Sequence, residues 1–196
     1  MRTQAHGIDE LEQRLKRTPP ISTPFVEYRF SHLLKRPLRT SGLLEYRADG
    51  VMARTVDAPY RERTEIAGDE VRMRRGDQPE RRMSLQRAPQ MRLLLGAFRA
   101  LLEGRLAPLG ADFEVTLAEH EDRWLLTLKP RDARLAGKLA RIDVHGSADR
   151  PVCLESIEPD GDATLTMFAA AYESLRPDRA ELEKSCRIAV TATHAP

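Results

Sequence analysis

A histidine surrounded by carboxylates is the most obvious candidate for chemistry in this sequence of 196 residues. His120 is flanked by Glu119, Glu121 and Asp122, and imidazole and carboxylate groups are common ligands of divalent metal ions. The alternating residues on both sides predict strands, in which neighbouring side chains point to opposite faces. The four side chains therefore cannot converge on one ion, and we predict a solvated hairpin tip without a metal.

Two other short segments resemble sites but lack essential parts. Asp160 and Asp162 flank Gly161 as in a calcium loop, but the remaining ligand positions are missing, so a hairpin is predicted. Ser147, in the run HGS, has neither an acid partner nor a nucleophile elbow, which indicates the end of a strand. The sequence also lacks an HExxH helix, a phosphate loop and a dinucleotide-binding turn. We therefore predict a protein without enzyme activity, metal or cofactor.

The chain has two cysteines, Cys153 and Cys186, each in a segment that resembles a strand. Neither belongs to a CxxC pair or lies near a histidine at a metal-ligand spacing. In an oxidising compartment they could form one disulfide, closing a loop of about 33 residues and contributing roughly 3 to 4 kcal/mol. Two unconnected buried thiols are an equally open interpretation of the sequence.

The composition is that of a globular protein, with 41% apolar and 32% charged residues. The length suits one domain, and we predict that residues 1–196 form it. Acidic residues interrupt every basic cluster and aromatic residues make up only 5% of the chain. Nucleic-acid binding, which favours a basic stripe interleaved with aromatic residues, is therefore not expected.

The elements that would position a site are strands arranged around one apolar helix. Residues 89–104 read PQMRLLLGAFRALLEG, with apolar residues at helical spacing. Pro89 suits the first turn of a helix and Gly104 suits its C-terminal stop. A sheet-rich chain with such a helix needs a surface for the helix to cover, either a packed core or a cavity.

Residues of alternating polarity predict strands on both sides of this helix. The first begins at Pro24 and has Val26, Tyr28 and Phe30 on one face, and Asp49-Gly50 predicts a hairpin turn after the second. The other strands are predicted at 41–47, 51–56, 60–66, 70–75, 113–117, 124–128, 142–146, 152–158 and 163–170. Further helices are predicted at 8–17 and 130–140, and a helical turn at 176–183 leads into a last strand containing Cys186, Ile188 and Val190. Sequential strands with short turns indicate a mainly β fold, an antiparallel meander with a few inserted helices.

The sequence resembles the LolA family of bacterial periplasmic lipoprotein carriers, particularly its LolA-related branch. Four segments carry the resemblance by their order and spacing: FVEYRF, PLRTSGLLEYRADGVMARTVDAPYRERTEIAGDEV, ALLEG and DRWLLTLKP. The similarity runs from Ile8 to Phe168. It implies a mainly β (α+β) fold, an incomplete antiparallel β-barrel or half-barrel, covered by an α-helical lid over an apolar cavity for acyl chains.

The resemblance also implies roles for particular residues. The helix at 89–104 would be the lid, with Met91, Leu94, Leu95, Phe98 and Leu101 on its apolar face, and the strands between 42 and 71 would form the barrel wall. The expected cavity lining is Tyr28, Phe30, Leu44, Tyr46, Phe113, Trp124 and Leu126. Family members have an Arg-Pro pair after the first wall strand, with the arginine tied to lid closure. This chain has Arg47 near that position and lacks the proline, which makes Arg47 the candidate latch.

The function implied by the resemblance is a periplasmic carrier that shelters the acyl chains of a lipoprotein or lipid. The implied partners are an inner-membrane release complex and an outer-membrane acceptor that receives the cargo. A sixteen-carbon chain gains about 12 kcal/mol by leaving water, so binding of this kind needs no catalytic residue. The first residues, MRTQAHGIDE, lack the apolar core of a secretory signal, which is compatible with a cytoplasmic protein or with removal of a leader. The resemblance implies a periplasmic protein whose signal peptide has been removed.

Other functions remain open at the level of sequence. The protein could be a LolA-related carrier or accessory protein for a lipid or aryl-polyene pigment pathway, or a lipidated outer-membrane acceptor of the same fold. An enzyme of lipid or pigment assembly would have a polar cavity floor with His32 or His145 paired to a carboxylate. A structural interaction module would use its apolar helix only to fill the core.

Overall fold

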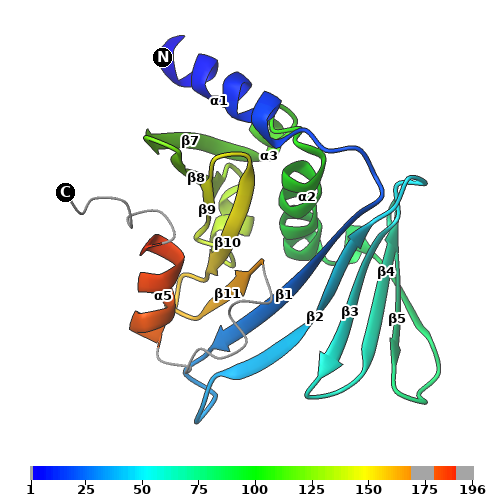
Figure 1. The fold of residues 1–196 in the computed structure, drawn as a ribbon. Helices are drawn as coiled ribbons and strands as arrows, with labels where there is room; N and C mark the ends of the chain where they lie inside the picture. Colours follow the sequence, from blue (N-terminus) through cyan, green and yellow to red (C-terminus); the bar gives the residue numbers. More distant parts are fainter. Residues whose placement is uncertain (1, 169–178, 189–196) are drawn as a thin grey trace.

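The fold is built on one open antiparallel sheet. A computed structural model of the protein describes residues 2–168 and 179–188. Eleven strands follow the order β6-β5-β4-β3-β2-β1-β11-β10-β9-β8-β7, so β6 and β7 are the two edges (Figure 1). The strands are β1 (Ile21–Phe30), β2 (Leu38–Tyr46), β3 (Met52–Ala58), β4 (Glu62–Ala67), β5 (Glu70–Arg75), β6 (Arg81–Ser84), β7 (Phe113–His120), β8 (Arg123–Pro130), β9 (Arg141–Ser147), β10 (Arg150–Ile157) and β11 (Ala163–Met167). The predicted mainly β fold, an incomplete barrel with a helical cover, is confirmed.

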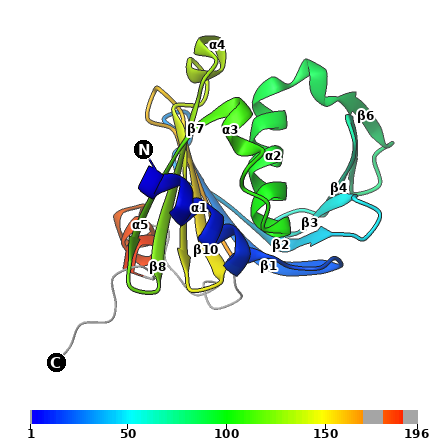
Figure 2. The same ribbon diagram turned by 90° about the horizontal axis from the view of Figure 1, so that it is seen from above.

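Helices lie on both faces of this sheet. They are α1 (Arg2–Leu15), α2 (Pro89–Glu103), α3 (Leu109–Asp112), α4 (Ala133–Ala136) and α5 (Arg179–Ile188), with a 3₁₀ turn η1 (Leu85–Arg87) before α2. Helices α1, α2 and α3 share a core cluster with β7 to β10, whereas α5 packs with β1, β10 and β11 in a separate cluster. Viewed from above, α2 lies inside the curve of the strands from β1 to β6 (Figure 2).

Two meanders meet at one strand pair. Strands β1 to β6 follow one another in sequence and in space, and so do β7 to β11. The pairing of β1 with β11 joins them, with Tyr28 opposite Leu165. Helix α2 connects the two edge strands, which explains why the most apolar segment of the chain lies between the two halves of the sheet.

Pro89 and Gly104 define the two ends of α2. Pro89 occupies the first turn, and Gly104 adopts a left-handed conformation with φ of 62° as its C-terminal cap. A Cβ atom at Gly104 would lie 2.4 Å from the backbone nitrogen of Lys16, so the end of α1 also requires glycine here. The carboxylate of Glu12 on α1 then accepts hydrogen bonds from the backbone of Leu106 and Ala107, at 2.7 and 3.0 Å.

The C-terminal part of the prediction was wrong. Cys186 was placed in a strand with Ile188 and Val190, but Cys186 and Ile188 belong to helix α5, and Val190 lies outside the described residues. The segment RAELEKSCRI is rich in strong helix formers. Leu182 and Cys186 are one turn apart and both are buried, so the helix covers the sheet with its apolar edge.

Candidate functional site

The concave face of β1 to β5 carries a row of buried apolar side chains. Residues that stand opposite each other in antiparallel pairs point to the same face, and the pairs Ile21 with Tyr46, Tyr46 with Met52, and Met52 with Ile66 all lie on the concave face. The buried side chains of this face are Phe25, Leu44, Tyr46, Met52, Val56, Ile66 and Val71. They form two neighbouring clusters that α2 covers.

Helix α2 has apolar side chains on two sides. Leu93, Ala97, Ala100 and Leu101 are buried in the cluster shared with α1, α3 and β7 to β10. Its other side, consisting of Leu95, Phe98 and Leu102, packs against the concave face. The helix therefore packs between the two halves of the sheet and contacts both.

Phe98 is the residue where these clusters meet. It contacts the clusters of both halves and makes an edge-to-face contact with Phe168, with 6.0 Å between the ring centroids. Phe98 is only partly buried, as are Leu94 and Leu95. This part of α2 therefore covers apolar side chains of the sheet while its own side chains remain partly exposed.

An apolar groove opens beside this junction. Its volume is about 360 Å³, which lies at the lower end of the range for small-molecule pockets. It runs between the end of α1, the start of β1 and the last turns of α2, and its apolar walls are Leu15, Ile21, Pro24, Leu101, Leu102 and Phe168. Arg17 and Asp149 form an ion pair of 2.5 Å among the groove residues, which puts polar groups beside an apolar interior.

A polar contact ties α2 to the sheet. The hydroxyl of Tyr46, at the end of β2, donates a hydrogen bond to the carboxylate of Glu103, at the end of α2. The Arg99 guanidinium donates to the same carboxylate at 2.8 Å and lies 5.8 Å from the centre of the Tyr46 ring. We call Tyr46, Arg99 and Glu103 the latch.

The pKa values of Tyr46 and Glu103 are shifted in opposite directions. Burial raises the pKa of Tyr46 above its ordinary value of 10.0, and the hydrogen bond to Glu103 raises it further. Burial alone would raise the pKa of Glu103, but hydrogen bonds from Tyr46 and Arg99 outweigh it and lower that pKa. The closed latch therefore contains a neutral phenol, a carboxylate and a guanidinium at neutral pH.

Arg47, the predicted latch, has other partners. Its guanidinium lies 2.5 Å from Asp49, in the turn after β2, and 3.6 Å from Glu65 on β4. The residue next to it, Tyr46, makes the contact with the lid. In this structure Arg47 therefore has partners on the sheet side, whereas Tyr46 contacts α2, because neighbouring residues at the end of a strand point to opposite faces.

The predicted cavity lining divides into three groups. Leu44 and Tyr46 lie on the concave face under α2. Tyr28 and Phe30 are corrected to the opposite face, where they pack with α5. Phe113, Trp124 and Leu126 face α1 and α2 but are at most 1% exposed in a filled core, and a Cβ atom at Gly146 would lie 1.9 Å from the Trp124 ring. The core around Trp124 and Leu126 is therefore closely packed.

The predicted lid residues also differ in environment. Leu101 is buried in the core, whereas Leu94, Leu95 and Phe98 are partly buried. Met91 is 37% exposed near the start of α2. The middle of the helix therefore carries the side chains that could exchange protein contacts for ligand contacts.

A second polar cluster lies on the concave face beyond Phe25. Glu27 accepts hydrogen bonds from Arg54 at 2.8 Å, Thr40 at 3.3 Å and Thr166 at 3.2 Å. The Arg54 guanidinium lies 4.7 Å from the centre of the Phe25 ring. Sequence reasoning missed this cluster and the lid half of the latch, although Arg99 and Glu103 show the four-residue spacing of a helical ion pair.

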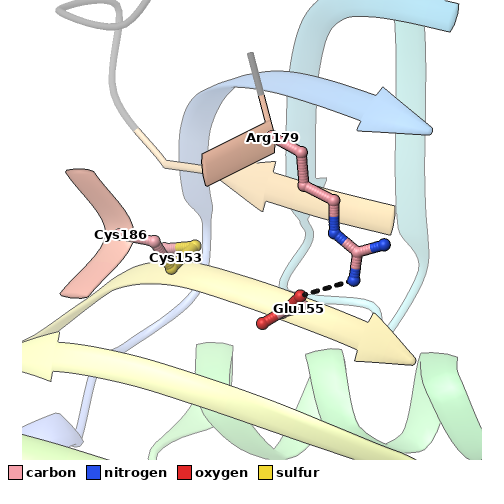
Figure 3. The surroundings of a disulfide bond; sticks show 4 residues. All are labelled: Cys153, Glu155, Arg179 and Cys186. Atoms are coloured by element: carbon pink, nitrogen blue, oxygen red, sulfur yellow. Dashed lines mark ion pairs between the residues drawn. A yellow bond between two sulfur atoms is a disulfide. The ribbon is translucent and has the colours of Figure 1, made fainter. Parts of the chain in front are cut away.

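Cys153 and Cys186 form a disulfide that fastens α5 to the outer face of the sheet (Figure 3). Cys153 lies on β10 and Cys186 on α5, and both are buried with Val26, Tyr28 and Leu182. Arg179 at the start of α5 lies 3.8 Å from Glu155 on β10 (Figure 3). The bond thus holds the helix on the face opposite the lid.

The predicted histidine sites lie away from the groove and the concave face. His120, Glu119 and Asp122 belong to the β7–β8 hairpin. His32 pairs with Asp162 at 2.9 Å and is 3.9 Å from Asp160, so the structure joins a histidine to the supposed calcium loop. His32 and Asp160 are exposed and Asp162 is buried, where the β1–β2 loop meets the β10–β11 hairpin, away from the concave face in which the enzyme alternative places its cavity floor. His145 is buried on the outer face, where it stands opposite Cys153.

Solved structures with a similar course of the chain are distant in sequence. They include a LolA superfamily protein from Nitrosomonas europaea (9% identity, covering 85% of this chain and 91% of that one, TM-score 0.43) and a DUF1329 family protein from Desulfovibrio piger (9% identity, 91% and 98%, TM-score 0.45). LprF from Mycobacterium bovis is another (9% identity, 90% and 98%, TM-score 0.37). No curated protein matches the sequence.

Within residues 2–168 and 179–188, no helix has both the length and the apolar character that crossing a bilayer demands. A family model described as "Outer membrane lipoprotein carrier protein LolA-like" matches residues 2–193, nearly the whole sequence. With this match and an open antiparallel sheet curved around α2, the chain belongs to the LolA-like outer membrane lipoprotein carrier protein family.

Proposed function

We propose that this protein is a periplasmic carrier that shelters the acyl chains of a lipoprotein or lipid between α2 and the concave face. The observation that carries the proposal is the partly buried set Leu94, Leu95 and Phe98, which packs against the apolar clusters on both sides of α2 beside a groove of about 360 Å³. A structural helix of this apolarity would be sealed into a single core. Here it separates two clusters, and movement of its middle would open the space between them.

The energies favour a lid that cargo can displace. Each methylene group removed from water contributes about 0.8 kcal/mol, so a sixteen-carbon chain gains on the order of 12 kcal/mol. A hydrogen bond to a charged group contributes roughly 1.5 to 3 kcal/mol to stability. We expect a contribution of this size from the hydrogen bond between Tyr46 and Glu103. Acyl chains that replace the contacts of Phe98 and Leu95 can therefore open the latch without a chemical step.

The disulfide supports an oxidising compartment. Cys153 and Cys186 are bonded, and such bonds persist in the bacterial periplasm but are rare in the cytoplasm. Together with the membership of the LolA-like family, this favours a carrier that works between two membranes. In this proposal the cargo is released by an inner-membrane complex and received by an outer-membrane acceptor with greater affinity for the same chains.

Binding of a fluorescent long-chain fatty acid tests the proposal. We expect the protein to take up the probe, and Phe98→Asp, which places a charge in the space for the chain, to weaken binding at least tenfold. Met91→Asp is the matched control, since Met91 lies on the same helix and is already 37% exposed. If Phe98→Asp does not fold, Leu95→Gln tests the same surface.

Native mass spectrometry of the protein from a membrane-containing host provides a second readout. We expect bound species with masses of lipids or fatty acids, which Phe98→Asp loses and Met91→Asp retains. Absence of bound acyl species together with absence of probe uptake would overturn the carrier function.

A further inference from the structure

The β1–β2 loop gathers exposed apolar side chains at one end of the molecule. Leu33, Leu34 and Leu38 are 81%, 42% and 39% exposed. In the described part of the chain, the other exposed large apolar side chains are Met83 and Met91, on different elements. Scattered exposed apolar residues are normal, but three leucines within six residues form a patch that marks an interaction site.

Hydrogen bonds order the β1–β2 loop into a turn in which these leucines are exposed. The backbone N–H of Leu34 donates to the carbonyl of Ser31 at 2.9 Å, and the N–H of Leu33 donates to the Ser31 hydroxyl at 3.3 Å. The Asp162 carboxylate, in the neighbouring β10–β11 hairpin, accepts from the backbone N–H of His32 at 2.9 Å and contacts its ring at the same distance. Leucine exposure is therefore a property of an anchored turn, and the turn projects away from α1 at the lower end of Figure 1.

Two cations lie beside the leucines. Lys35 and Arg36 follow directly in the sequence and are exposed. Among the residues that the structure describes, neither has a carboxylate within 4.0 Å, whereas Glu158 is paired with Arg29 and Asp162 with His32. Both cations, with Arg179, line a surface pocket of about 310 Å³ that also contains Asp160 and Asp162. The charges next to the leucines are thus available to an anionic partner.

A convex tip of leucines flanked by cations fits a bilayer surface better than a protein groove. Leucine side chains enter the boundary between headgroups and acyl chains, and Lys or Arg side chains reach back to the phosphates. We infer that the β1–β2 loop is a membrane-docking tip, in which Leu33 and Leu34 enter an anionic bilayer surface while Lys35 and Arg36 bind its headgroup phosphates. This interaction goes beyond the carrier function and does not use the lid.

Co-sedimentation with vesicles tests the tip. The vesicles contain phosphatidylcholine alone or with 30% phosphatidylglycerol. We expect the wild-type protein to bind the anionic vesicles, the double variant Leu33→Ser/Leu34→Ser to bind at least tenfold more weakly, and Met83→Ser to bind like the wild type. Each cation near an anionic surface contributes about fivefold to affinity, so Lys35→Gln/Arg36→Gln should weaken binding roughly 25-fold and abolish its salt dependence.

Insertion has a direct spectroscopic readout. Leu33→Trp adds an exposed tryptophan to a protein whose Trp124 is fully buried. We expect its emission to shift to shorter wavelength with anionic vesicles and to be quenched by brominated acyl chains. Failure of the wild-type protein to bind, or equal binding by the leucine double variant, would overturn the inference. So would leucine-dependent self-association without vesicles, because the patch would then contact a second copy.

The two proposals can fail separately. The leucine double variant should keep full uptake of the fluorescent fatty acid, because the loop lies outside the concave face. Phe98→Asp should in turn keep full vesicle binding. A variant that loses both properties would indicate a folding defect, which the urea midpoint of the same sample reveals.

Discussion

The hydroxyl group of Tyr46 on β2 donates a hydrogen bond to the carboxylate of Glu103, which also accepts from Arg99. This contact joins the barrel wall to the end of α2 that is already held by the close approach of Gly104 to Lys16. At the opposite end of the helix, the N-terminal cap has no side-chain hydrogen bond. Helix α2 is therefore fixed most firmly at its C-terminal end, and we expect its N-terminal half to move first.

The latch predicts a specific effect of one oxygen atom. Tyr46→Phe removes the hydroxyl that bonds to the charged Glu103 carboxylate and keeps the ring, so we expect the free energy of unfolding to fall by about 1.5 to 3 kcal/mol. We also expect faster hydrogen exchange in α2 and faster uptake of a fluorescent fatty acid. Arg47→Gln is the control, because Arg47 pairs with Asp49 and Glu65 on the wall. Equal uptake rates for the Tyr46→Phe and Arg47→Gln variants would contradict a latch at Tyr46.

Acid should weaken the same latch. Hydrogen bonds hold the pKa of Glu103 below its ordinary value of 4.5, so its carboxylate stabilises the folded state above that pH. The contribution is lost as the pH falls through the lower pKa of the folded state. We expect wild type and Glu103→Gln to differ in urea midpoint at pH 6, to begin to converge below about pH 4.5, and to coincide only below the lowered pKa of Glu103 in the folded state. A difference that stays constant down to pH 3 would show that the charge of Glu103 does not act in the latch.

The sequence predicted those elements whose ends are determined by local residue types. Pro89 and Gly104 defined α2, and the Asp49-Gly50 pair marked the turn between β2 and β3, where Gly50 has φ of 80°. Glu70–Arg75 was predicted with its observed ends. Strand β6 was missed because Arg81–Ser84 is short and polar, and only its pairing with β5 makes it a strand.

The site was harder to predict than the fold, because contacts between distant residues decide it. Phe25 and Val26 are both buried, since α2 covers one face of β1 and α5 covers the other. Alternation shows that Tyr28 and Phe25 point to opposite faces but not which face the lid covers. Likewise, nothing near Tyr46 in the sequence indicates that Glu103, 57 residues later, is its partner.

Loss of the disulfide should destabilise the protein without opening the lid. The bond between Cys153 and Cys186 closes a loop of 33 residues, so reduction should lower the free energy of unfolding by about 3 to 4 kcal/mol. Urea denaturation with and without reductant measures this, and Cys153→Ala/Cys186→Ala should match the reduced protein. The bond lies on the outer face, so fatty acid uptake by the fraction that stays folded should be unchanged. Loss of uptake at full folding would show that α5 supports the concave face.

Two glycines should respond in opposite directions to the same methyl group. Gly146 on β9 faces Trp124, and an added Cβ atom would lie 1.9 Å from the ring in a fully packed core. Gly146→Ala should therefore lower the free energy of unfolding by about 3 kcal/mol and alter Trp124 emission. Gly96 lies inside α2 with nothing within 4 Å of an added Cβ, so Gly96→Ala should raise it by about 1 kcal/mol. Urea denaturation measures both, and a mild effect at Gly146 would mean that the core around Trp124 has free space for a ligand.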